Sequence, residues 1–305
     1  MGTPDYAVPT LKKLIEKHTV LAVVSQPDKP KGRGKKMVFT PVKEVAVQNN
    51  IPVLQPIKVR ESEVIEEIKK FEPEVIVVVA FGQILPKELL DVPKYGCINV
   101  HGSLLPKYRG AGPIQWAVIN GEKVTGNTTM FMGVGLDTGD MLLKSENIIE
   151  PEDTYETLYN KMAQTGADLL IKTLEELEKG TLKRQAQDDS QATYAPQLTK
   201  ETGHIDWSKK SNDIVNLVRG LDPWPSAYTD YNGETLKIWK AQECEKDYCD
   251  KQVGEITEIV KNTGFIVKCG DKSVLVTEIQ AQGGKRMKVG DYLRGHSIQT
   301  QTVLK

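Results

Sequence analysis

The sequence is poor in the residues that most often bind metals or form disulfide bonds. Its 305 residues include four histidines and four cysteines, and no two cysteines form a C-x-x-C pair. This spacing argues against a zinc site or a disulfide framework, so we expect incidental thiols and no bound metal. The sequence also has no G-x-G-x-x-G, G-x-x-x-x-G-K-[ST], H-E-x-x-H or G-x-S-x-G motif. It therefore offers no support for a dinucleotide site, a phosphate loop, metal catalysis or a serine nucleophile.

Long apolar runs and a leader segment are also missing. No run approaches the roughly 18 apolar residues of a membrane helix, and Met1 leads into Gly-Thr-Pro-Asp rather than into a basic and then apolar stretch. Basic and acidic residues nearly balance, at 40 and 41, so binding to a polyanion must come from a local patch. We expect a cytoplasmic protein with no membrane partner and no obligate protein partner.

The first half of the chain alternates apolar, strand-like runs with amphipathic helical patterns. Strand-like runs lie at 19–25, 74–81 and 97–101, and helical patterns begin near Val8, Pro41 and Arg60, with a long helix expected at 154–180. Continuous apolar strands separated by amphipathic helices are typical of a parallel sheet covered on both faces. We therefore predict a Rossmann-like, mostly parallel α/β domain.

The texture changes after about Gln185, where a polar, turn-rich stretch suits a linker. Short strand-like runs follow at 235–241, 254–260, 264–269 and 273–280, punctuated by Gly, Asn and Asp. Such runs indicate a small antiparallel barrel or sandwich, and we predict an OB-like barrel. The expected domains are therefore an α/β domain at 1–184, a linker at 185–204 and a β-barrel domain at 205–305.

The start of the chain is anomalous. Residues 1–9 (MGTPDYAVP) read as the loop after a first strand and the opening of a helix, yet no strand precedes them. We therefore expect a sheet whose first strand is missing. Whether Met1 is an internal methionine of a longer chain is left open.

Two polar residues end the apolar run at 97–101. Asn99 and His101 are two residues apart, so they point to the same side of an extended strand. An amide donor beside an imidazole suits a group transfer in which an oxyanion develops and a proton moves. The alternative is a structural histidine bonded to a backbone carbonyl. A carboxylate could orient this imidazole and hold it protonated, and both Asp137 and Asp140 are candidates, although an Asp between glycines also suits a turn.

Two segments are locally basic. The stretch from Lys29 to Lys43 contains six Lys or Arg residues and no acid, and its glycines and prolines indicate a mobile loop. From Ile259 onward, eight basic residues face three acidic ones, including Lys285, Arg286 and Lys288. Either segment could contact nucleic-acid phosphates, whereas the simpler interpretation is a solvated loop.

Four segments together resemble the methionyl-tRNA formyltransferases. They are MGTPDYAVP, QPDKPKGRGKK, CINVHGSLLPKYRGAGPIQ and GLDTGDML. The NVHGSLLP element alone resembles the wider group of formyltetrahydrofolate-dependent enzymes. The basic loop together with the C-terminal β domain points to the tRNA-specific enzymes within that group. Members of this family normally begin with a short apolar strand just before MGTP.

The resemblance implies transfer of a formyl group from 10-formyltetrahydrofolate to the α-amino group of methionine on initiator tRNA, for translation initiation, without a metal. It assigns catalysis to Asn99, His101 and Asp137. The implied folate-binding residues are Ser103, Leu104, Leu105, Pro106, Phe81, Gln83, Ile84 and Leu85. We expect the tRNA acceptor arm to contact Arg33, Lys35, Lys36, Lys285, Arg286 and Lys288.

Three other functions stay open at this point. The chain could be another formyltetrahydrofolate enzyme, acting on glycinamide ribonucleotide or an amino sugar. It could be an RNA-binding module whose α/β half is catalytically idle, which intact Asn99, His101 and Asp137 disfavour. A nicotinamide dehydrogenase is disfavoured by the missing dinucleotide fingerprint.

Overall fold

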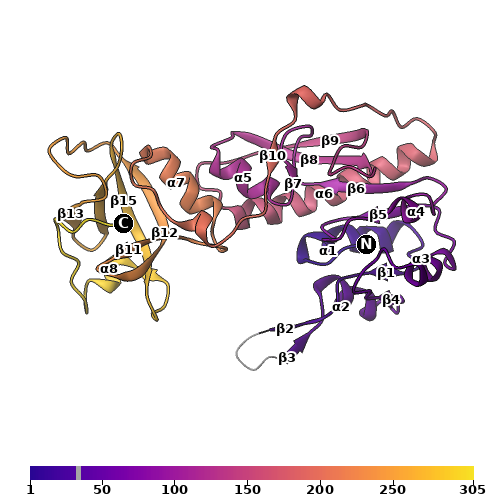
Figure 1. Ribbon diagram of the computed structural model, residues 1–305, viewed down its shortest axis with the longest axis horizontal. Helices are drawn as coiled ribbons and strands as arrows, with labels where there is room; N and C mark the ends of the chain where they lie inside the picture. The colour runs from indigo at the N-terminus through magenta and orange to yellow at the C-terminus, as the bar shows by residue number, and fades with distance from the viewer. Residues whose placement is uncertain (32–35) are drawn as a thin grey trace. The chain divides into compact units, whose positions relative to one another are not determined.

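The computed structural model describes residues 1–31 and 36–305, which form two compact units (Figure 1). Unit 1 comprises 1–113, 124–148 and 159–195, and unit 2 comprises 114–123, 149–158 and 196–305. Each unit is therefore assembled from several chain segments. Of the stretch predicted as a linker, residues 185–195 lie in unit 1 and the remainder lies in unit 2.

Unit 1 is an α/β unit in which short strands alternate with helices. Its elements, with 3-10 helices marked η, are η1 (Asp5–Ala7), α1 (Val8–Lys17), β1 (Val23–Val24), β2 (Lys29–Lys31), β3 (Lys36–Val38), α2 (Pro41–Gln48), β4 (Val53–Leu54), α3 (Ser62–Lys69), β5 (Ile76–Val78), α4 (Lys87–Leu90), β6 (Cys97–His101), β7 (Arg109–Gly110), β8 (Val124–Phe131), β9 (Met141–Ile148), most of α6 (Tyr155–Glu178), η2 (Asp189–Gln191) and β10 (Tyr194–Ala195).

Unit 2 is dominated by antiparallel strands. Its elements are α5 (Pro113–Ile119), the first turn of α6, η3 (Glu201–Gly203), α7 (Ser211–Gly220), β11 (Ala227–Tyr231), β12 (Glu234–Cys244), β13 (Ile256–Val260), β14 (Gly264–Lys268), β15 (Ser273–Ala281), β16 (Met287–Lys288) and α8 (Val289–Tyr292). The four strand runs expected after residue 234 are confirmed as β12 to β15.

The sheet of unit 1 combines parallel and antiparallel neighbours. Strand β6 pairs in parallel with β5 and antiparallel with β8, and β9 follows β8, while β1 pairs in parallel with β4. Helix α6 covers one face of this sheet, where Thr173 Oγ1 lies 2.8 Å from Thr129 Oγ1 of β8. The helix approaches so closely that a β-carbon on Gly166 would lie 3.1 Å from the Val100 side chain. The predicted Rossmann-like α/β fold is thus confirmed, with an antiparallel edge.

A cavity lies in unit 1 between β1 and β5. Met1 and Gly2 border this cavity. The Met1 amino group donates to Val77 O at 2.6 Å, and the Gly2 N–H donates to Val24 O at 3.0 Å. The cavity has a volume of about 550 Å³ and is also bordered by residues 19–24 and 73–77 and by side chains of α1, α3 and α6. The strands on its two sides, β1 and β5, belong to separate sheets among the described residues.

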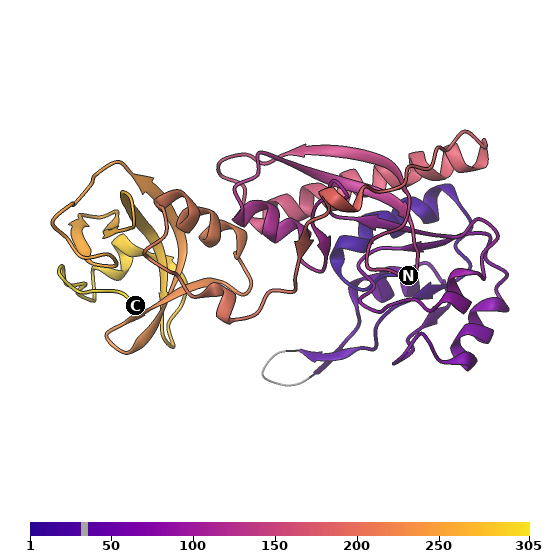
Figure 2. The same ribbon diagram turned by 45° about the horizontal axis from the view of Figure 1, so that its top comes forward.

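The basic stretch after residue 28 differs from its prediction as an unstructured loop. Strands β2 and β3 form an antiparallel hairpin, with Lys29 opposite Val38 and Lys31 opposite Lys36. Both ribbon views show these strands projecting from unit 1 (Figures 1 and 2). The side chain of Lys43 fixes the base of the hairpin through bonds of 2.6 Å to Asp28 and to Gln55.

The strands of unit 2 form one antiparallel sheet that the C-terminal residues close. The strand order is β11-β12-β15-β14-β13, with β16 against β15. Residues 301–305 pair with both outer strands: Ile256 N donates to Thr302 O at 2.8 Å, and Asp230 exchanges backbone bonds with Lys305. A sheet closed in this way leaves fewer exposed edges. The predicted small antiparallel β domain is confirmed.

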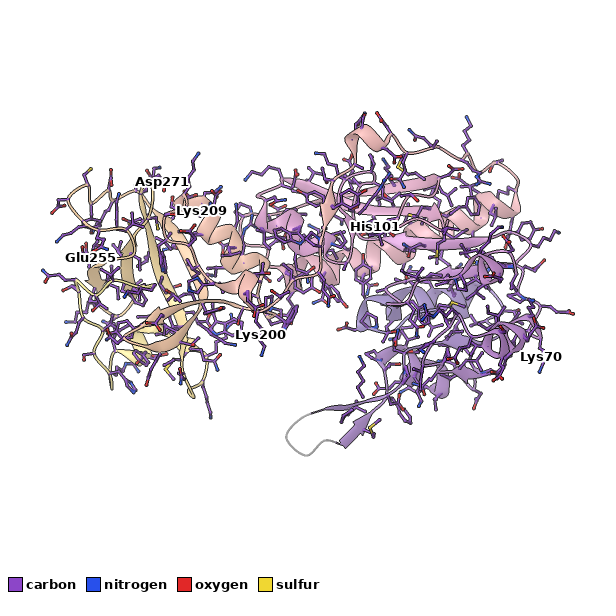
Figure 3. The ribbon with its side chains drawn as sticks, viewed as in Figure 1. Lys70, His101, Lys200, Lys209, Glu255 and Asp271 are labelled. Carbon is purple, nitrogen blue, oxygen red and sulfur yellow. The ribbon has the colours of Figure 1, made fainter. Side chains whose placement is uncertain are left out.

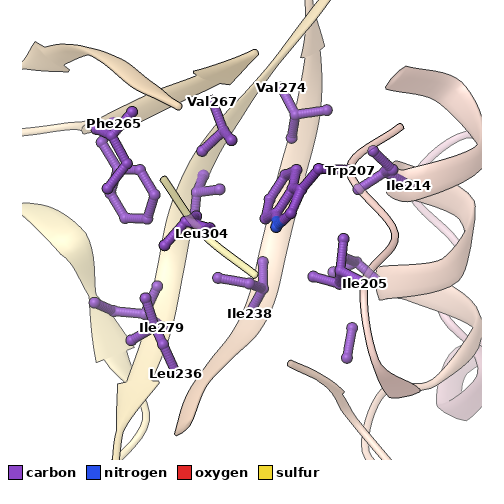
Figure 4. Packing of buried hydrophobic residues seen from close by; sticks show 14 of the residues in the cluster. Ile205, Trp207, Ile214, Leu236, Ile238, Phe265, Val267, Val274, Ile279 and Leu304 are labelled. Atoms are coloured by element: carbon purple, nitrogen blue, oxygen red, sulfur yellow. The ribbon is translucent and has the colours of Figure 1, made fainter. Parts of the chain in front are cut away.

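The interior of this closed sheet holds a single apolar cluster (Figure 4). Trp207 lies within it beside Ile238 and Val274, and its indole N–H donates to Thr229 Oγ1 at 3.0 Å. Strands β12, β14 and β15 supply seven of the other sixteen residues of the cluster, mainly at alternate positions, as expected for strands with one buried face. The pattern explains why short runs of β-branched residues predicted these strands.

We expect that an apolar strand joined to Met1 fills the cavity of unit 1 and stabilises it. Gly2 pairs with Val79, so five residues ahead of Met1 would lie opposite residues 73–77. A Val/Ile extension of five residues should raise the thermal midpoint of unit 1 by about 5–10 °C, because burying each such side chain contributes about 1.5–3 kcal/mol before ordering costs. A five-residue Ser/Gly/Asn extension is the matched control, and an equal shift for both variants would contradict the prediction.

The same comparison should depend on pH. Burial lowers the pKa of the Met1 amino group from 8.0 to about 6. Between these values the unfolded chain binds a proton that the folded chain does not, so the parent chain loses stability as the pH falls from 8 to 6. The extension moves the ammonium group out of the cavity. Its stabilising effect should therefore be larger at pH 6 than at pH 8.

Candidate active site

His101 ends strand β6 with both ring nitrogens facing defined partners. The side chain is only 6% exposed, and Nε2 lies 2.8 Å from the carbonyl oxygen of Tyr108. A carbonyl oxygen only accepts, so Nε2 carries a proton. The alternative of a histidine bonded to a backbone carbonyl is thus realised at one nitrogen. Nδ1 is left facing the neighbouring turn, and Figure 3 labels the residue in unit 1.

Asp137 is the carboxylate that approaches this imidazole. Its Oδ2 lies 3.7 Å from His101 Nδ1 and accepts a hydrogen bond of 2.9 Å from Gly110 N–H. The other candidate, Asp140, instead pairs with Arg184 at 3.0 Å. The geometry therefore favours Asp137 over Asp140. Asp137 has φ +51°, a conformation that non-glycine residues adopt rarely and that other contacts must stabilise.

Asn99 lies two residues before His101 in β6, so the two side chains point to the same side of the strand. It is half-buried, and its backbone lies opposite Val78 of β5 and Met130 of β8. Within residues 1–31 and 36–305, its side-chain amide makes no hydrogen bond. A donor that the protein leaves uncommitted, beside an oriented imidazole, can bind a ligand oxygen.

The loop after β6 is fixed by buried polar contacts. Thr128 Oγ1 donates to Ser103 O at 2.7 Å and accepts from Leu105 N–H at 3.1 Å. Ser103 Oγ donates to Lys107 O, and Lys144 Nζ donates to Leu105 O, each at 2.6 Å. Partial burial lowers the pKa of the Lys144 ammonium. The Ser103–Pro106 loop is therefore held firmly beside His101.

The other predicted folate-binding residues differ in exposure. The side chains of Phe81 and Leu85 are buried in the apolar core, as is Leu105, so only their backbone groups are available to a ligand. Gln83 accepts from Val59 N–H at 2.7 Å. Ile84 is 80% exposed, whereas Leu104 and Pro106 are half-buried.

The predicted tRNA-contacting residues are only partly described. Arg33 and Lys35 lie outside the described residues, and Lys36 is described through its backbone alone, as the start of β3. Lys285 and Lys288 are exposed in unit 2. Arg286 is instead engaged within the protein: it pairs with Glu278 and Asp222 and its guanidinium stacks on Trp239 at 4.6 Å.

Two residues that sequence reasoning missed connect the parts of this site. Arg109 is 2% exposed and donates to Gln187 and to Asp189. Gln187 in turn donates to the backbone carbonyls of Asp137 and Gly139. The only sequence signal was an arginine inside a Gly-rich loop, and nothing marked the glutamine.

No group of three or more His, Cys, Asp or Glu side chains is arranged to hold a metal ion among residues 1–31 and 36–305. Within the same residues, no helix is both long and apolar enough to cross a membrane.

The comparisons with known proteins place both halves of the chain in one class. The family model described as "Formyl transferase" matches residues 1–174, and "Formyl transferase, C-terminal domain" matches residues 197–297. Formyl transferases are therefore the class of protein that this fold and this site define.

Full-length relatives show which family of formyl transferases the chain belongs to. The methionyl-tRNA formyltransferases of Caldanaerobacter subterraneus subsp. tengcongensis and Clostridioides difficile are each 53% identical to this chain, covering 100% of it and 98% of their own length. That of Clostridium acetobutylicum is equally similar over the same share. The chain belongs to the methionyl-tRNA formyltransferase family, as the sequence motifs predicted.

Solved structures share the fold at lower identity. WlaRD, a sugar 3N-formyl transferase, has a TM-score of 0.66 and 20% identity, over 90% of this chain and 94% of that one. The methionyl-tRNA formyltransferase from Clostridium thermocellum has a TM-score of 0.50 and 21% identity, over 66% of this chain and 87% of that one. At these identities the likeness supports the fold alone.

We expect Thr128→Val to loosen the Ser103–Pro106 loop. The substitution leaves the Ser103 carbonyl and the Leu105 N–H without their buried partner, at a cost of about 1–3 kcal/mol for each group. Chemical denaturation should show a lower free energy of unfolding, and amide exchange at Leu105 should accelerate. Thr128→Ser keeps the hydroxyl and serves as control. Equal behaviour of the two variants would show that the hydroxyl is not what holds the loop.

Proposed function

We propose that this protein transfers the formyl group of 10-formyltetrahydrofolate to the α-amino group of methionine on initiator tRNA. The observation that carries the proposal is the Asp137 carboxylate 3.7 Å from the His101 imidazole at the end of β6, with Asn99 two residues earlier on the same strand. An amide donor, an imidazole and a carboxylate are the groups that acyl transfer to an amine requires. The full-length relatives support methionyl-tRNA as the acceptor.

We propose that Asn99 and His101 stabilise the oxyanion that forms at the formyl oxygen when the amine attacks the formyl carbon. The Asn99 amide is uncommitted within the described residues, and His101 Nδ1 faces the turn that bears Asp137. Donors of this kind contribute most when they are fixed before the reaction, because no reorganisation is then needed. The Nε2 bond to Tyr108 O supplies that fixation for the imidazole.

Asp137 has a second task in this proposal. The amine must lose a proton as its nitrogen bonds to the formyl carbon, and the Asp137 carboxylate accepts that proton, directly or through water. The oxyanion then re-forms the carbonyl as the bond between the formyl carbon and N10 of the folate breaks, and N10 takes the proton that Asp137 accepted.

The folate is proposed to bind beside the Ser103–Pro106 loop. Ligand sites commonly combine apolar surface with a few fixed polar groups, and this region offers both. Ile84, Val134 and Leu136 are exposed apolar side chains, and Leu136 directly precedes Asp137. The Thr128 and Lys144 contacts hold the backbone of the loop in place, so its peptide groups could read the edge of the pterin.

The basic hairpin is proposed to bind the acceptor arm of the tRNA. Its strands carry Lys29, Lys31 and Lys36, and the segment between them carries Arg33 and Lys35. Phosphate neutralisation by such residues supplies most sequence-independent affinity for nucleic acids. Lys285 and Lys288 offer further exposed charge in unit 2, whereas the ion pairs of Arg286 make it the weakest member of the predicted set.

We expect Asn99→Ala, His101→Ala and Asp137→Ala each to lower turnover by about 10²–10³-fold, since each removes one fixed polar group from the reacting centre. The assay is formyl transfer to charged initiator tRNA, with far-ultraviolet circular dichroism confirming that each variant folds. Asp140→Ala is the matched control, because it alters the same turn but pairs with Arg184. Full activity of His101→Ala would refute the proposed mechanism.

We expect Arg33→Ala to weaken use of Met-tRNA and to leave folate binding unchanged. The KM for Met-tRNA should rise, and its dependence on log[salt] should weaken by about one unit, as for the loss of one phosphate contact. Lys12→Ala on α1 removes an exposed cation elsewhere in unit 1 and is the control. An equal loss of folate affinity and tRNA use would contradict this assignment.

A further inference from the structure

Gln187 connects the buried Arg109 with the turn that carries Asp137. Its Oε1 accepts from Nε and Nη2 of Arg109 at 3.0 and 2.8 Å. Its Nε2 donates to the carbonyl oxygens of Asp137 at 2.7 Å and Gly139 at 2.8 Å. An amide has two donors and one acceptor oxygen with two lone pairs, so every hydrogen-bonding position of Gln187 is used.

Arg109 is a firm anchor for this amide. A buried guanidinium is always charged and must be paired, and its Nη2 also contacts Asp189 Oδ1 at 2.7 Å. Its backbone is fixed too, since β7 pairs with β10 and the Arg109 N–H donates to Thr193 O. The segment Gln187–Ala195, which we name the strap, therefore lies along the loop that follows β6.

The turn at Asp137 depends on contacts of this kind. Its positive φ is unfavourable for a non-glycine residue, and its neighbours Val134 and Leu136 are exposed rather than packed. Only the Gly110 N–H hydrogen-bonds its carboxylate among the described residues. The position of the carboxylate is therefore set by the backbone of the turn, and Gln187 holds two carbonyls of that backbone.

We propose that Gln187 is a positioning residue for formyl transfer: it ties the Asp137 turn to Arg109 and so holds the carboxylate against His101. This inference rests on the proposed function, because it assigns to Gln187 the task of orienting Asp137. Misplacement of a reacting group by about 1 Å can cost roughly 100-fold in rate. The strap is thus part of the active site, although the sequence suggested a linker there.

The test is Gln187→Glu, which changes the amide with almost no change in size. A carboxylate still accepts both bonds from Arg109, so the anchor and the strap should stay folded. It cannot donate to the carbonyls of Asp137 and Gly139, so the turn is released. We expect kcat to fall by about 10–100-fold, with the KM for Met-tRNA changed by less than about threefold and the thermal midpoint nearly unchanged.

Gln191→Glu is the matched control. Gln191 belongs to the same strap and is exposed. Among residues 1–31 and 36–305 its side chain donates only to Asp188, so the same chemical change should leave kcat unaltered. A normal kcat for Gln187→Glu would overturn the inference. So would a loss of activity that only follows a loss of folded protein, or an equal effect of Gln191→Glu.

Asp137→Ala, assayed in parallel, separates the two hypotheses. If Asp137→Ala is inactive and Gln187→Glu is fully active, only the role of Gln187 is refuted. If Asp137→Ala keeps full turnover, the assignment of Asp137 has failed, and the role of Gln187 fails with it.

Discussion

The hydrogen bond between His101 Nε2 and the Tyr108 carbonyl determines how this site is arranged. It closes the loop after β6 back onto the end of the strand, and it commits one ring nitrogen to a proton. The other nitrogen is thereby directed toward Asp137. A free imidazole could rotate between several partners, whereas this one presents a single nitrogen to the turn. The loop, the turn and the strap all serve to keep this arrangement in place.

Much of the fold could be predicted because its signals are local. The run CINVH is apolar, β-branched and ends in two polar residues, and it forms β6 with the expected bounds. The predicted strand at 19–25 is shortened to Val23–Val24, where the backbone pairs with β4 and bonds to Gly2. Gln187 carried no signal, since its partners lie 50 and 78 residues away in the chain.

The same reasoning explains why the proposed catalytic residues could be predicted from the sequence, whereas the residues that hold them in place could not. Asn99, His101 and Asp137 belong to short motifs in which residue type and spacing indicate chemistry. Arg109 lies in the same motif, yet a charged residue in a glycine-rich loop is normally solvated. It is buried here only because Asp189 and Gln187 arrive from the strap. Such pairings depend on tertiary structure, which spacing along the chain does not encode.

The cavity of unit 1 and the candidate site lie at different ends of the strands. At the carboxyl ends of the strands, hydrogen bonds connect the segments after Gly2, β1 and β5. Thr3 Oγ1 donates to Phe81 O at 3.2 Å, and Gln26 donates to the same carbonyl. The loop that begins at Phe81 is therefore anchored even though the cavity below is open. The open cavity should thus lower the stability of unit 1 more than it disturbs the geometry around His101. The bonds that orient the imidazole run through β6, β7 and the strap, which do not border the cavity.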